Sequence, residues 1–382
     1  MSIRLLKLGD LAAIAKGKKH MHVMGLPSSG SKRYIQIDDL RSDNNLKFTT
    51  DLGVEVLHND VIIAWDGANA GTVGFGLEGY IGSTLARLRL LESQVDSTYF
   101  GWFLRSRSTS IRKMCYGATI PHVNKSILES IEVPLPPLPI QKEIAIILEK
   151  AHAAREKRRQ ANQLTEQFLQ SAFLDMFGDP VMNPKGWKIG VLGEAIGYSE
   201  YGTSEKSNDE KRGWPIIGMR NVTYGGQLDL TGLTYVELPD KDFEKLRLQR
   251  GDIIFNRTNS TELVGKTAHW NLEIDAVLAS YLVKLRLTPE FNPTWFSALL
   301  NTTYCKKLFM QRCKKAVGQS NISPTLLKEL PMYKPTLSEQ QKFAALAEKV
   351  EALRGKQWES EMELEKLFNS LMQRAFKGEL VQ

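Results

Sequence analysis

The chain contains one long element twice. The segment Gly117–Phe177 is repeated without a gap as Ala316–Phe376, so that Val123 corresponds to Ile322 at a constant offset of 199 positions. A constant offset over a segment of this length indicates an internal duplication. The chain is therefore expected to fold as two copies of one unit rather than as a single irregular domain.

The duplication extends upstream with small gaps. Leu8-Gly9-Asp10 matches Leu192-Gly193-Glu194, and Asn59-Asp60-Val61 matches Gly251-Asp252-Ile253. The offset drifts through these matches before it settles. The globular parts have thus diverged by insertion and substitution while the segments that follow them stayed in register. We expect the two copies to carry out different versions of one task.

Composition places the chain among ordinary globular proteins. It has 382 residues, of which 42% are hydrophobic, enough for two cores of domain size. No apolar run reaches the roughly 18 residues that a membrane span needs, and the first residues lack the features of a signal peptide. The three cysteines form no C-x-x-C pair. We therefore expect a protein of the reducing cytoplasm with no membrane association.

The net charge of +7 lies in the globular parts. Ile140–Phe177 holds six basic and five acidic residues, and Leu337–Gln382 holds seven and eight, so these two segments together are neutral. An excess of positive charge confined to the duplicated domains indicates a polyanionic partner.

The fold class predicted is mixed α/β (α+β), with two duplicated globular domains and two long helices. We expect the domains at 1–135 and 181–335, and the helices at 136–180 and 336–382. Short strand-like runs are separated by turns rich in Gly and Asn, and each domain contains one helical segment. The predicted strands are Tyr34–Ile37, Val61–Trp65, Ala86–Leu90, Ile216–Met219, Ile253–Phe255 and Leu282–Leu287, and the predicted helices are Ser97–Met114 and Pro293–Lys315.

The two long helices have coiled-coil spacing, which predicts an antiparallel pair with pseudo-two-fold symmetry. Opposite charges favour a register with Arg158 facing Gln357, in which Glu166 meets Lys349. Solvated helices without pairing are the alternative. The predicted apolar seam consists of Ile144, Ile147, Ala151, Ala154, Phe168, Phe343, Leu346, Val350, Leu353, Leu364, Leu367 and Leu371.

No catalytic or metal-binding constellation is present in the sequence. Val264-Gly265-Lys266-Thr267 resembles the end of a phosphate-binding loop, but Ser260 stands where that motif requires glycine. His20-Met21-His22 has no acidic or cysteine partner at ligand spacing. We predict that this chain has no catalytic residues, no metal site and no enzyme activity of its own.

Several motifs together carry a family resemblance. The two long helices open with PLPPLPIQKEIAIILE from Pro134 and PTLSEQQKFAALAE from Pro335, and close with SAFLDMFGDP and RAFKGEL. Asn-Pro-x-Gly-Trp at Asn183–Trp187 opens the second unit. In these features the whole chain resembles the specificity subunit of type I restriction–modification systems.

The resemblance implies two target recognition domains, each reading one half of a split double-stranded DNA sequence, held apart by the helices. It also implies two methyltransferase subunits that dock on the helices, methylate adenine at N6 and bind S-adenosylmethionine, leaving this chain without a cofactor. Restriction–translocation subunits are a further partner that the resemblance allows. The alternative hypothesis is a free-standing coiled-coil DNA-binding regulator or scaffold protein.

Candidate DNA-binding residues are polar or basic side chains in turns, because base edges require hydrogen-bond donors and acceptors and phosphates require Lys or Arg. Ordinary surface residues are the competing interpretation. The candidates for base contacts are Lys32, Arg33, Trp65, Asn69 and His122 in the first domain, and Arg220, Asn221, Arg257, Asn259, Gln319 and Asn321 in the second. The candidates for backbone contacts are the helical groups Arg105, Arg107, Arg112 and Lys113, and Lys306, Lys307, Arg312, Lys314 and Lys315.

Overall fold

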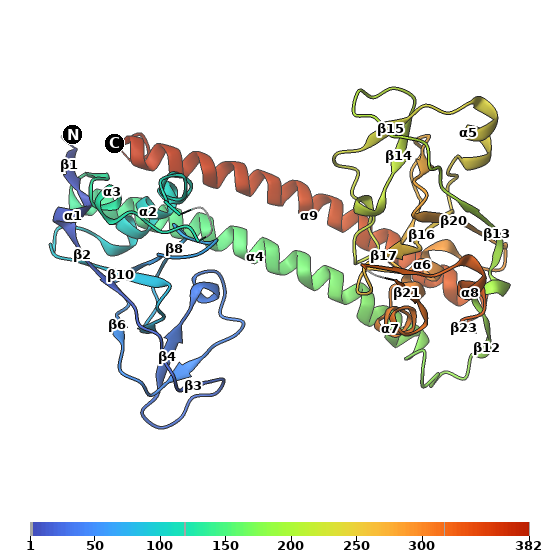
Figure 1. Ribbon diagram of the computed structural model, residues 1–382, viewed down its shortest axis with the longest axis horizontal. Helices are drawn as coiled ribbons and strands as arrows, with labels where there is room; N and C mark the ends of the chain where they lie inside the picture. The colour runs from blue at the N-terminus through green and yellow to red at the C-terminus, as the bar shows by residue number, and fades with distance from the viewer. Residues whose placement is uncertain (1–2, 118–119, 317, 382) are drawn as a thin grey trace. The chain divides into compact units, whose positions relative to one another are not determined.

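The computed structural model describes residues 3–117, 120–316 and 318–381, which form two compact units. Unit 1 contains the described residues up to Arg159 together with those from Glu359 onward, and unit 2 is Gln160–Trp358. Each unit therefore holds one globular part and one half of each long helix, α4 (Leu138–Phe177) and α9 (Leu337–Lys377) (Figure 1). The units are larger than the predicted recognition domains because the helix halves complete their cores.

The globular part of unit 1 is built on a four-stranded antiparallel sheet in the order β2-β10-β7-β8. A second sheet, in the order β3-β5-β4-β9-β6, includes one parallel pair, β4 with β9. The strands are β2 (Ala12–Lys16), β3 (Val23–Met24), β4 (Lys32–Ile35), β5 (Phe48–Thr49), β6 (Val54–Val56), β7 (Val61–Ala64), β8 (Val73–Phe75), β9 (Gly79–Ile81) and β10 (Leu85–Leu90), and the 3-10 helix η1 spans Ile37–Leu40.

The four-stranded sheet of unit 1 is buried on both faces. Val61 and Ile63 of β7 point toward helix α2 (Ser97–Lys113), and Ile62 and Ala64 point toward the second sheet. Successive side chains of a strand point to opposite faces, so a strand covered on both sides needs a continuous apolar run. This requirement explains why β7 is apolar at every position.

Unit 2 repeats this topology with the sheet β13-β20-β16-β18. Two three-stranded sheets accompany it, β15-β14-β19 and β17-β22-β21. The elements are β13 (Ile196–Tyr201), β14 (Trp214–Ile217), η3 (Met219–Asn221), β15 (Thr234–Val236), α5 (Asp240–Leu246), β16 (Ile253–Asn256), β17 (Thr258–Asn259), β18 (Thr267–His269), β19 (Val277–Leu278), β20 (Leu282–Leu287), β21 (Lys314–Ala316) and β22 (Gln319–Asn321).

The single helix predicted for Pro293–Lys315 is wrong. The structure has two helices, α6 (Pro293–Leu300) and α7 (Thr303–Arg312). The break has a local cause, because the hydroxyl of Thr302 accepts a hydrogen bond from the backbone amide of Cys305 and so starts a new helix.

Two outer ribbons connect the sheets to the long helices. Strand β1 (Arg4–Lys7) pairs with β11 (Glu132–Leu135), directly before α4, and β12 (Lys188–Val191) pairs with β23 (Pro331–Lys334), directly before α9. The short helices beside the ribbons are α1 (Leu8–Leu11), α3 (Lys125–Glu129), η2 (Leu192–Glu194) and α8 (Pro324–Lys328).

A buried glutamine fixes the start of each long helix. The side-chain amide of Gln141 donates to the carbonyls of Pro136 (2.9 Å) and Gln94 (3.1 Å), and its oxygen accepts from the backbone of Asp96 (2.9 Å). Gln340 likewise donates to Pro335 (2.9 Å) and accepts from the backbone of Asn292 (2.8 Å). Asp96 and Asn292 are the N-caps of α2 and α6, so the glutamine ties the long helix to the domain helix.

An ion pair between a buried aspartate and a partly exposed arginine also occurs at equivalent positions in both units. Arg89 binds both carboxylate oxygens of Asp60 at 2.8 and 2.7 Å, and Arg286 binds those of Asp252 at 2.8 and 2.9 Å. Each carboxylate also accepts from the backbone amide three residues before it. Because the same ion pair and hydrogen bonds occur in both units, the two units share one framework.

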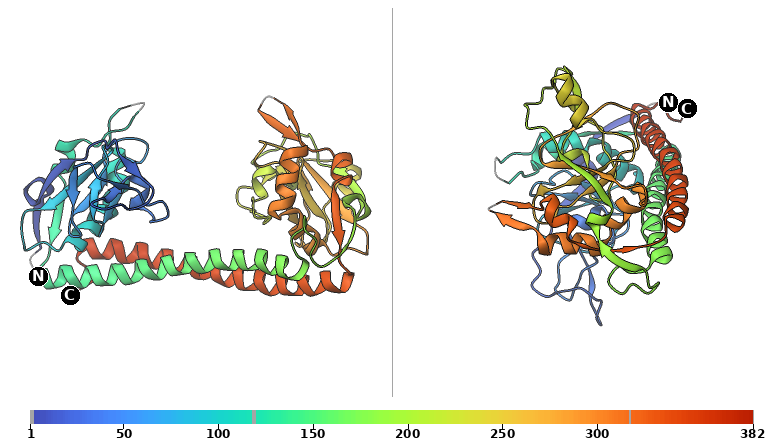
Figure 2. Two further views of the ribbon diagram at one scale, coloured as in Figure 1. Left: turned by 90° about the horizontal axis from the view of Figure 1, so that it is seen from below. Right: turned by 90° about the vertical axis from the view of Figure 1, so that its right-hand side faces the viewer.

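The long helices run antiparallel where they meet within each unit (Figure 2). In unit 1, Arg155 contacts Glu365 at 2.5 Å and Arg159 lies 3.8 Å from Glu361. In unit 2, Phe173 packs edge-on against Phe343, with ring centroids 5.3 Å apart. In both units the partner number falls as the α4 number rises.

The predicted register, with Gln357 facing Arg158, is wrong. Gln357 donates to the hydroxyl of Thr165 at 2.9 Å and not to Arg158. Exposed ion pairs contribute only about 0.2–1 kcal/mol each, whereas buried aromatic side chains dominate core energetics. We infer that the packing of Phe368 of α9 against His152 of α4 and Trp102 of α2 outweighs the exposed charges in setting the register.

The buried face of each helix also differs from the predicted seam. Phe168, Leu353 and Leu367 are 52%, 49% and 53% exposed, so their assignment to the seam is wrong. Phe173, Phe368 and Met372 are buried instead. A straight α-helix drifts by about 20° per heptad from the 3.5-residue repeat, and each helix half also turns toward its globular core. The buried predicted positions are Ile144, Phe343 and Val350, and the half-buried ones are Ile147, Ala151, Ala154, Leu346, Leu364 and Leu371.

Within the described residues, no helix is long and apolar enough to cross a membrane.

We predict that Gln340→Ala lowers the free energy of unfolding by about 1–3 kcal/mol, because it leaves the buried amide of Asn292 without an acceptor. The neighbouring, exposed Gln341 supplies the control, and Gln341→Ala should change the free energy by less than about 0.5 kcal/mol. Urea unfolding followed by tryptophan fluorescence measures both. Equal effects at the two positions would contradict the anchoring role.

Candidate nucleic-acid interface

Four of the second-domain candidates meet at one edge of unit 2. Arg257 follows β16, Asn259 lies on β17, and Gln319 and Asn321 lie on β22. The backbone of Arg257 is held on both sides, because its amide donates to Tyr281 (3.1 Å) and its carbonyl accepts from Ile322 (2.8 Å). Strands β17 and β22 then pair, with Thr258 opposite Asn321. We name this region, Arg257–Asn259 with Gln319–Asn321, the unit 2 edge.

The Arg257 side chain is half-buried and held in place. Its guanidinium carbon lies 4.8 Å from the ring centroid of Tyr201, and one terminal nitrogen donates to the carbonyl of Ser280 at 3.2 Å. Stacking on an aromatic face orders a guanidinium while leaving its other donors available for a ligand. Arg257 therefore presents donors from a fixed position.

The polar side chains of the unit 2 edge have defined partners. The amide of Asn321 donates to the hydroxyl of Thr258 at 2.7 Å, and Thr261 and Ser320 form a hydroxyl pair at 2.8 Å. Gln319 is exposed. Amide and guanidinium groups of this kind are those that distinguish base edges in a DNA groove.

Exposed cations flank the unit 2 edge. Lys307 and Arg312 are exposed on α7, and Lys314 and Lys315 are exposed on β21. Because these cationic side chains are exposed, they are able to neutralise DNA phosphates.

Lys306 differs from its neighbours, and its prediction as a backbone contact is wrong. It is buried, its ammonium donates to the carbonyl of Tyr224, and it lies 3.6 Å from the centroid of the Tyr224 ring. The apolar ring and the carbonyl compensate for the lost hydration. Burial lowers the pKa of Lys306 to about 8, although nearby Glu166 raises it. Helical periodicity places this residue inward, which a count of basic residues does not reveal.

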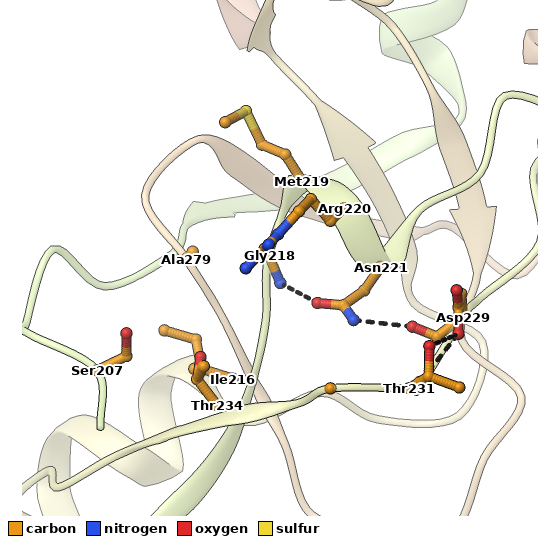
Figure 3. A pocket seen from close by; sticks show the side chains of 11 residues that line it. Ser207, Ile216, Gly218, Met219, Arg220, Asn221, Asp229, Thr231, Thr234 and Ala279 are labelled. Atoms are coloured by element: carbon orange, nitrogen blue, oxygen red, sulfur yellow. Dashed lines mark hydrogen bonds between the residues drawn. The ribbon is translucent and has the colours of Figure 1, made fainter. Parts of the chain in front are cut away.

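Arg220 and Asn221 line a cavity of about 430 Å³ in unit 2 (Figure 3). Arg220 is exposed. Asn221 is buried, accepting from the amide of Gly218 and donating to the carbonyl of Asp229, each at 2.8 Å. Its prediction as a base contact is wrong, because both polar ends of its side chain close a loop.

The equivalent edge of unit 1 has the same backbone connections. The amide of Trp65 donates to Thr84 at 2.7 Å and its carbonyl accepts from Val123 at 2.9 Å, as Arg257 does in unit 2. Asp66 then pairs with His122, as Thr258 pairs with Asn321. Trp65, Asn69 and His122 are thus brought to one place, which we name the unit 1 edge (Trp65–Asn69 with Pro121–His122).

The unit 1 edge contains a charged cluster. The Asp66 carboxylate contacts Nζ of Lys16 at 2.7 Å and Nδ1 of His122 at 2.6 Å, and Tyr116 tilts over the imidazole. Burial disfavours the Asp66 anion, but the hydrogen bonds from Lys16 and His122 outweigh it and hold the Asp66 pKa below its ordinary value. Asp66 is therefore a fixed anion that orients the imidazole.

Of the other unit 1 candidates, Lys32 and Arg33 lie elsewhere, whereas Asn69 belongs to the unit 1 edge. Arg33 is paired with Asp39 (2.8 Å) and Asp43 (2.6 Å), and Lys32 is paired with Glu55, both on the second sheet. The two basic side chains are engaged by carboxylates, so the structure does not bring them to the edge. Asn69 accepts from Arg41 at 2.6 Å.

The basic group on α2 is divided in the same way as that on α7. Arg105 is half-buried, with its guanidinium carbon 4.8 Å from the centroid of the Phe75 ring and 4.9 Å from that of Trp102. Arg107, Arg112 and Lys113 are exposed. Periodicity again separates inward from outward cations.

The residues of the phosphate-loop-like motif and the histidine pair have structural roles. Lys266 is buried and donates to the carbonyl of Met219 at 2.6 Å. His20 is buried against Thr49, while exposed His22 contacts Asp51 at 2.7 Å, so the two imidazoles do not converge. Across residues 3–117, 120–316 and 318–381 no group of three His, Cys, Asp or Glu could hold a metal ion.

The residues that complete the edges were not predicted from the sequence, namely Lys16, Asp66, Tyr116, Tyr201 and Thr258. The internal duplication could have pointed to two of these residues, Asp66 and Thr258. The duplication aligns His122 with Asn321. Asp66 pairs with His122 in unit 1, and Thr258 pairs with Asn321 in unit 2.

The family described as the type I restriction modification DNA specificity domain matches this chain twice, over residues 4–166 and 184–364. The chain belongs to this family. One copy of the specificity domain accounts for most of unit 1 and the other for most of unit 2.

Individual relatives agree with the family. The MjaVIII specificity subunit of Methanocaldococcus jannaschii is 34% identical over 38% of this chain, and the putative MjaX specificity subunit is 33% identical over 43%. The chain spans only 34% and 39% of the length of these two relatives. The EcoKI specificity subunit of Escherichia coli K12 is 24% identical over 84% of this chain and 75% of its own.

Two solved structures share the fold of this specificity-domain protein. The type I restriction–modification S subunit from M. genitalium aligns over 98% of this chain and 96% of its own, with TM-score 0.59 and 19% identity. A chain from a structure of a type I R-M system aligns over 99% and 98%, with TM-score 0.57 and 20% identity.

We predict that Lys306 makes stability rise with pH above about 8. The pKa of Lys306 in the folded chain lies below the ordinary value of 10.5. Between these two values the unfolded chain binds more protons than the folded chain, so stability rises with pH. The free energy of unfolding of the wild type relative to Lys306→Met should increase by about 1–2 kcal/mol from pH 7.5 to 9.5. Urea unfolding at both pH values measures this difference. Exposed Lys307→Met is the control, and a flat difference for Lys306→Met would contradict the prediction.

Proposed function

We propose that the chain is the sequence-specific DNA-recognition subunit of a type I restriction–modification complex, in which each unit reads one half of a bipartite target. The observation that carries this proposal is the double match to the DNA specificity domain, with one copy in each unit. Each copy presents polar side chains at the same structural edge, and the side chains differ between the copies.

The chemistry of the two edges supports base reading. Arg257, Asn321 and His122 supply guanidinium, amide and imidazole groups, which can hydrogen-bond to base edges in the major groove. The exposed cations on α7 and β21 would contact phosphates and supply affinity that is independent of sequence. Two different sets of readers imply two different half-sites.

Methyltransferase subunits are the proposed partners of the long helices. In unit 2, Leu164, Phe168, Leu353 and Trp358 are each about half or more exposed on α4 and α9. Apolar side chains exposed on helices favour a protein interface. The two partners would bind S-adenosylmethionine and methylate adenine at N6, and restriction–translocation subunits would join the same complex. A free-standing regulator would instead bind its target without a methyltransferase.

Methylation mapping tests the proposal directly. Co-expression of the chain with its methyltransferase subunit in a host that lacks adenine methylation should yield methylated adenines in one motif of two short blocks separated by an unspecified gap. Arg257→Ala should relax or change one block only, with a loss of about 1–3 kcal/mol in binding to the original target. Arg250, exposed and paired with Glu273, is the matched control, and Arg250→Ala should leave the motif unchanged. The absence of any sequence-specific methylation would refute the proposal.

We further propose that the long helices set the gap, since both contribute to both units. An insertion near Ser171 would displace Phe173 and Phe177 from the unit 2 core, so the insertion belongs where the units divide. Seven helix-forming residues added after Arg159 in α4 and after Trp358 in α9 lengthen each helix by ~10 Å, equivalent to ~3 base pairs.

The mapped motif should keep its letters while its gap grows by two to four base pairs, about the added length. An insertion in α4 alone misaligns the pair and should abolish methylation. A gap that stays fixed in the double insertion, or letters that change with it, would contradict the spacing role.

A further inference from the structure

The strand-pairing position shared by the two edges carries different chemistry in each unit. The backbone bridge between Asp66 and His122 in unit 1 corresponds to the pairing of Thr258 with Asn321 in unit 2. In both units the two side chains also hydrogen-bond to each other, at 2.6 Å between Asp66 and His122 and at 2.7 Å between Asn321 and Thr258. We name these the unit 1 pair and the unit 2 pair. Only the unit 1 pair contains an imidazole, whose second nitrogen can bind a further proton.

The geometry fixes which imidazole nitrogen faces outward. Nδ1 of His122 is bound to Asp66, whose second oxygen is bound to Lys16. The His122 side chain is 38% exposed, and no hydrogen bond from Nε2 occurs to any of the described residues. Because Asp66 stays ionised, it holds a proton on Nδ1 in both charge states of the ring. Nε2 is therefore the group that changes.

The change at Nε2 reverses its hydrogen-bonding role. In the neutral ring Nε2 is an acceptor, and in the charged ring it is a donor. A donor there suits a guanine O6 or N7, a thymine O4 or a phosphate oxygen, and added positive charge also favours a polyanion. The groups facing the ring are Asp66 after β7, Lys16 on β2 and Tyr116 beyond α2. Lys16 is itself half-exposed and adds positive charge at the edge.

We propose that His122 is a specificity-determining DNA contact of unit 1 and that its protonation couples recognition of the unit 1 half-site to pH. This inference rests on the proposed function. The unit 2 pair contains no titratable group, so recognition of the second half-site does not depend on pH through this position. The ligand atom is a hydrogen-bond acceptor on DNA.

The experiment uses the full chain in complex with its methyltransferase subunit and a duplex carrying the mapped target. Affinity is measured from pH 5.5 to 8.5 at constant ionic strength, with single base changes in either half-site. Wild-type affinity should fall as pH rises, by up to tenfold per pH unit where one proton is taken up. Discrimination against base changes in the unit 1 half-site should fall with it.

Exchange of the two pairs provides the decisive variants. The double substitution Asp66→Thr with His122→Asn should remove this component of the pH dependence and change the unit 1 half-site only. The reciprocal Thr258→Asp with Asn321→His should introduce pH dependence at the unit 2 half-site. His22→Gln is the matched control, because His22 also pairs with an aspartate but lies directly before β3 of the second sheet, and it should retain the wild-type profile. Thermal unfolding of each variant confirms that it is folded.

Two results separate the hypotheses. If the Asp66→Thr, His122→Asn variant is folded and keeps both the wild-type pH profile and the unit 1 half-site discrimination, this inference is wrong while the proposed function stands. If the wild-type complex shows no sequence preference at any pH, the proposed function itself fails.

Discussion

The buried glutamine at the start of each long helix is the contact on which the architecture depends. Gln141 and Gln340 each satisfy backbone groups at the end of the last strand and at the N-cap of the domain helix. One buried side chain thereby joins the strand end, the domain helix and the long helix. An unpaired buried polar group costs about 1–3 kcal/mol, so this joint is rigid in both units. The direction in which each long helix leaves its globular part follows from it.

On this shared frame the two units differ in the sheets that accompany the four-stranded sheet and in the pairs that close their edges. The ion pairs of Asp60 with Arg89 and of Asp252 with Arg286 have the same residues and the same bidentate geometry. The pairs that close the edges differ between the units, since one joins an imidazole to a carboxylate and the other joins an amide to a hydroxyl. Under the proposed function, change at these two paired positions after duplication gives the two units different specificities. The backbone does not need to change, because the ladder hydrogen bonds hold it.

Predictions from the sequence were correct for features that periodicity and the internal repeat indicate. They were wrong for features that depend on how side chains pack. The antiparallel long helices and the duplicated mixed domains were predicted. The register was wrong because exposed charges were given more weight than the aromatic contacts of Phe368 with His152 and Trp102. Lys306, Arg105 and Asn221 were assigned to a surface, yet each is wholly or partly buried with partners inside its own unit. Polar residue type alone does not show on which side of an element a group lies.

The sequence by itself determined the duplication, the two long helices, the excess of basic charge in the globular parts and the family. These features are encoded in local pattern and composition, which do not require long-range contacts. Only the tertiary structure determined which polar residues meet. Asp66 and His122 are 56 positions apart and come together through one backbone bridge, and Thr258 and Asn321 are 63 apart. Their pairing depends on how the chain closes around the sheet, and that closure is fixed by core packing among residues distant in sequence.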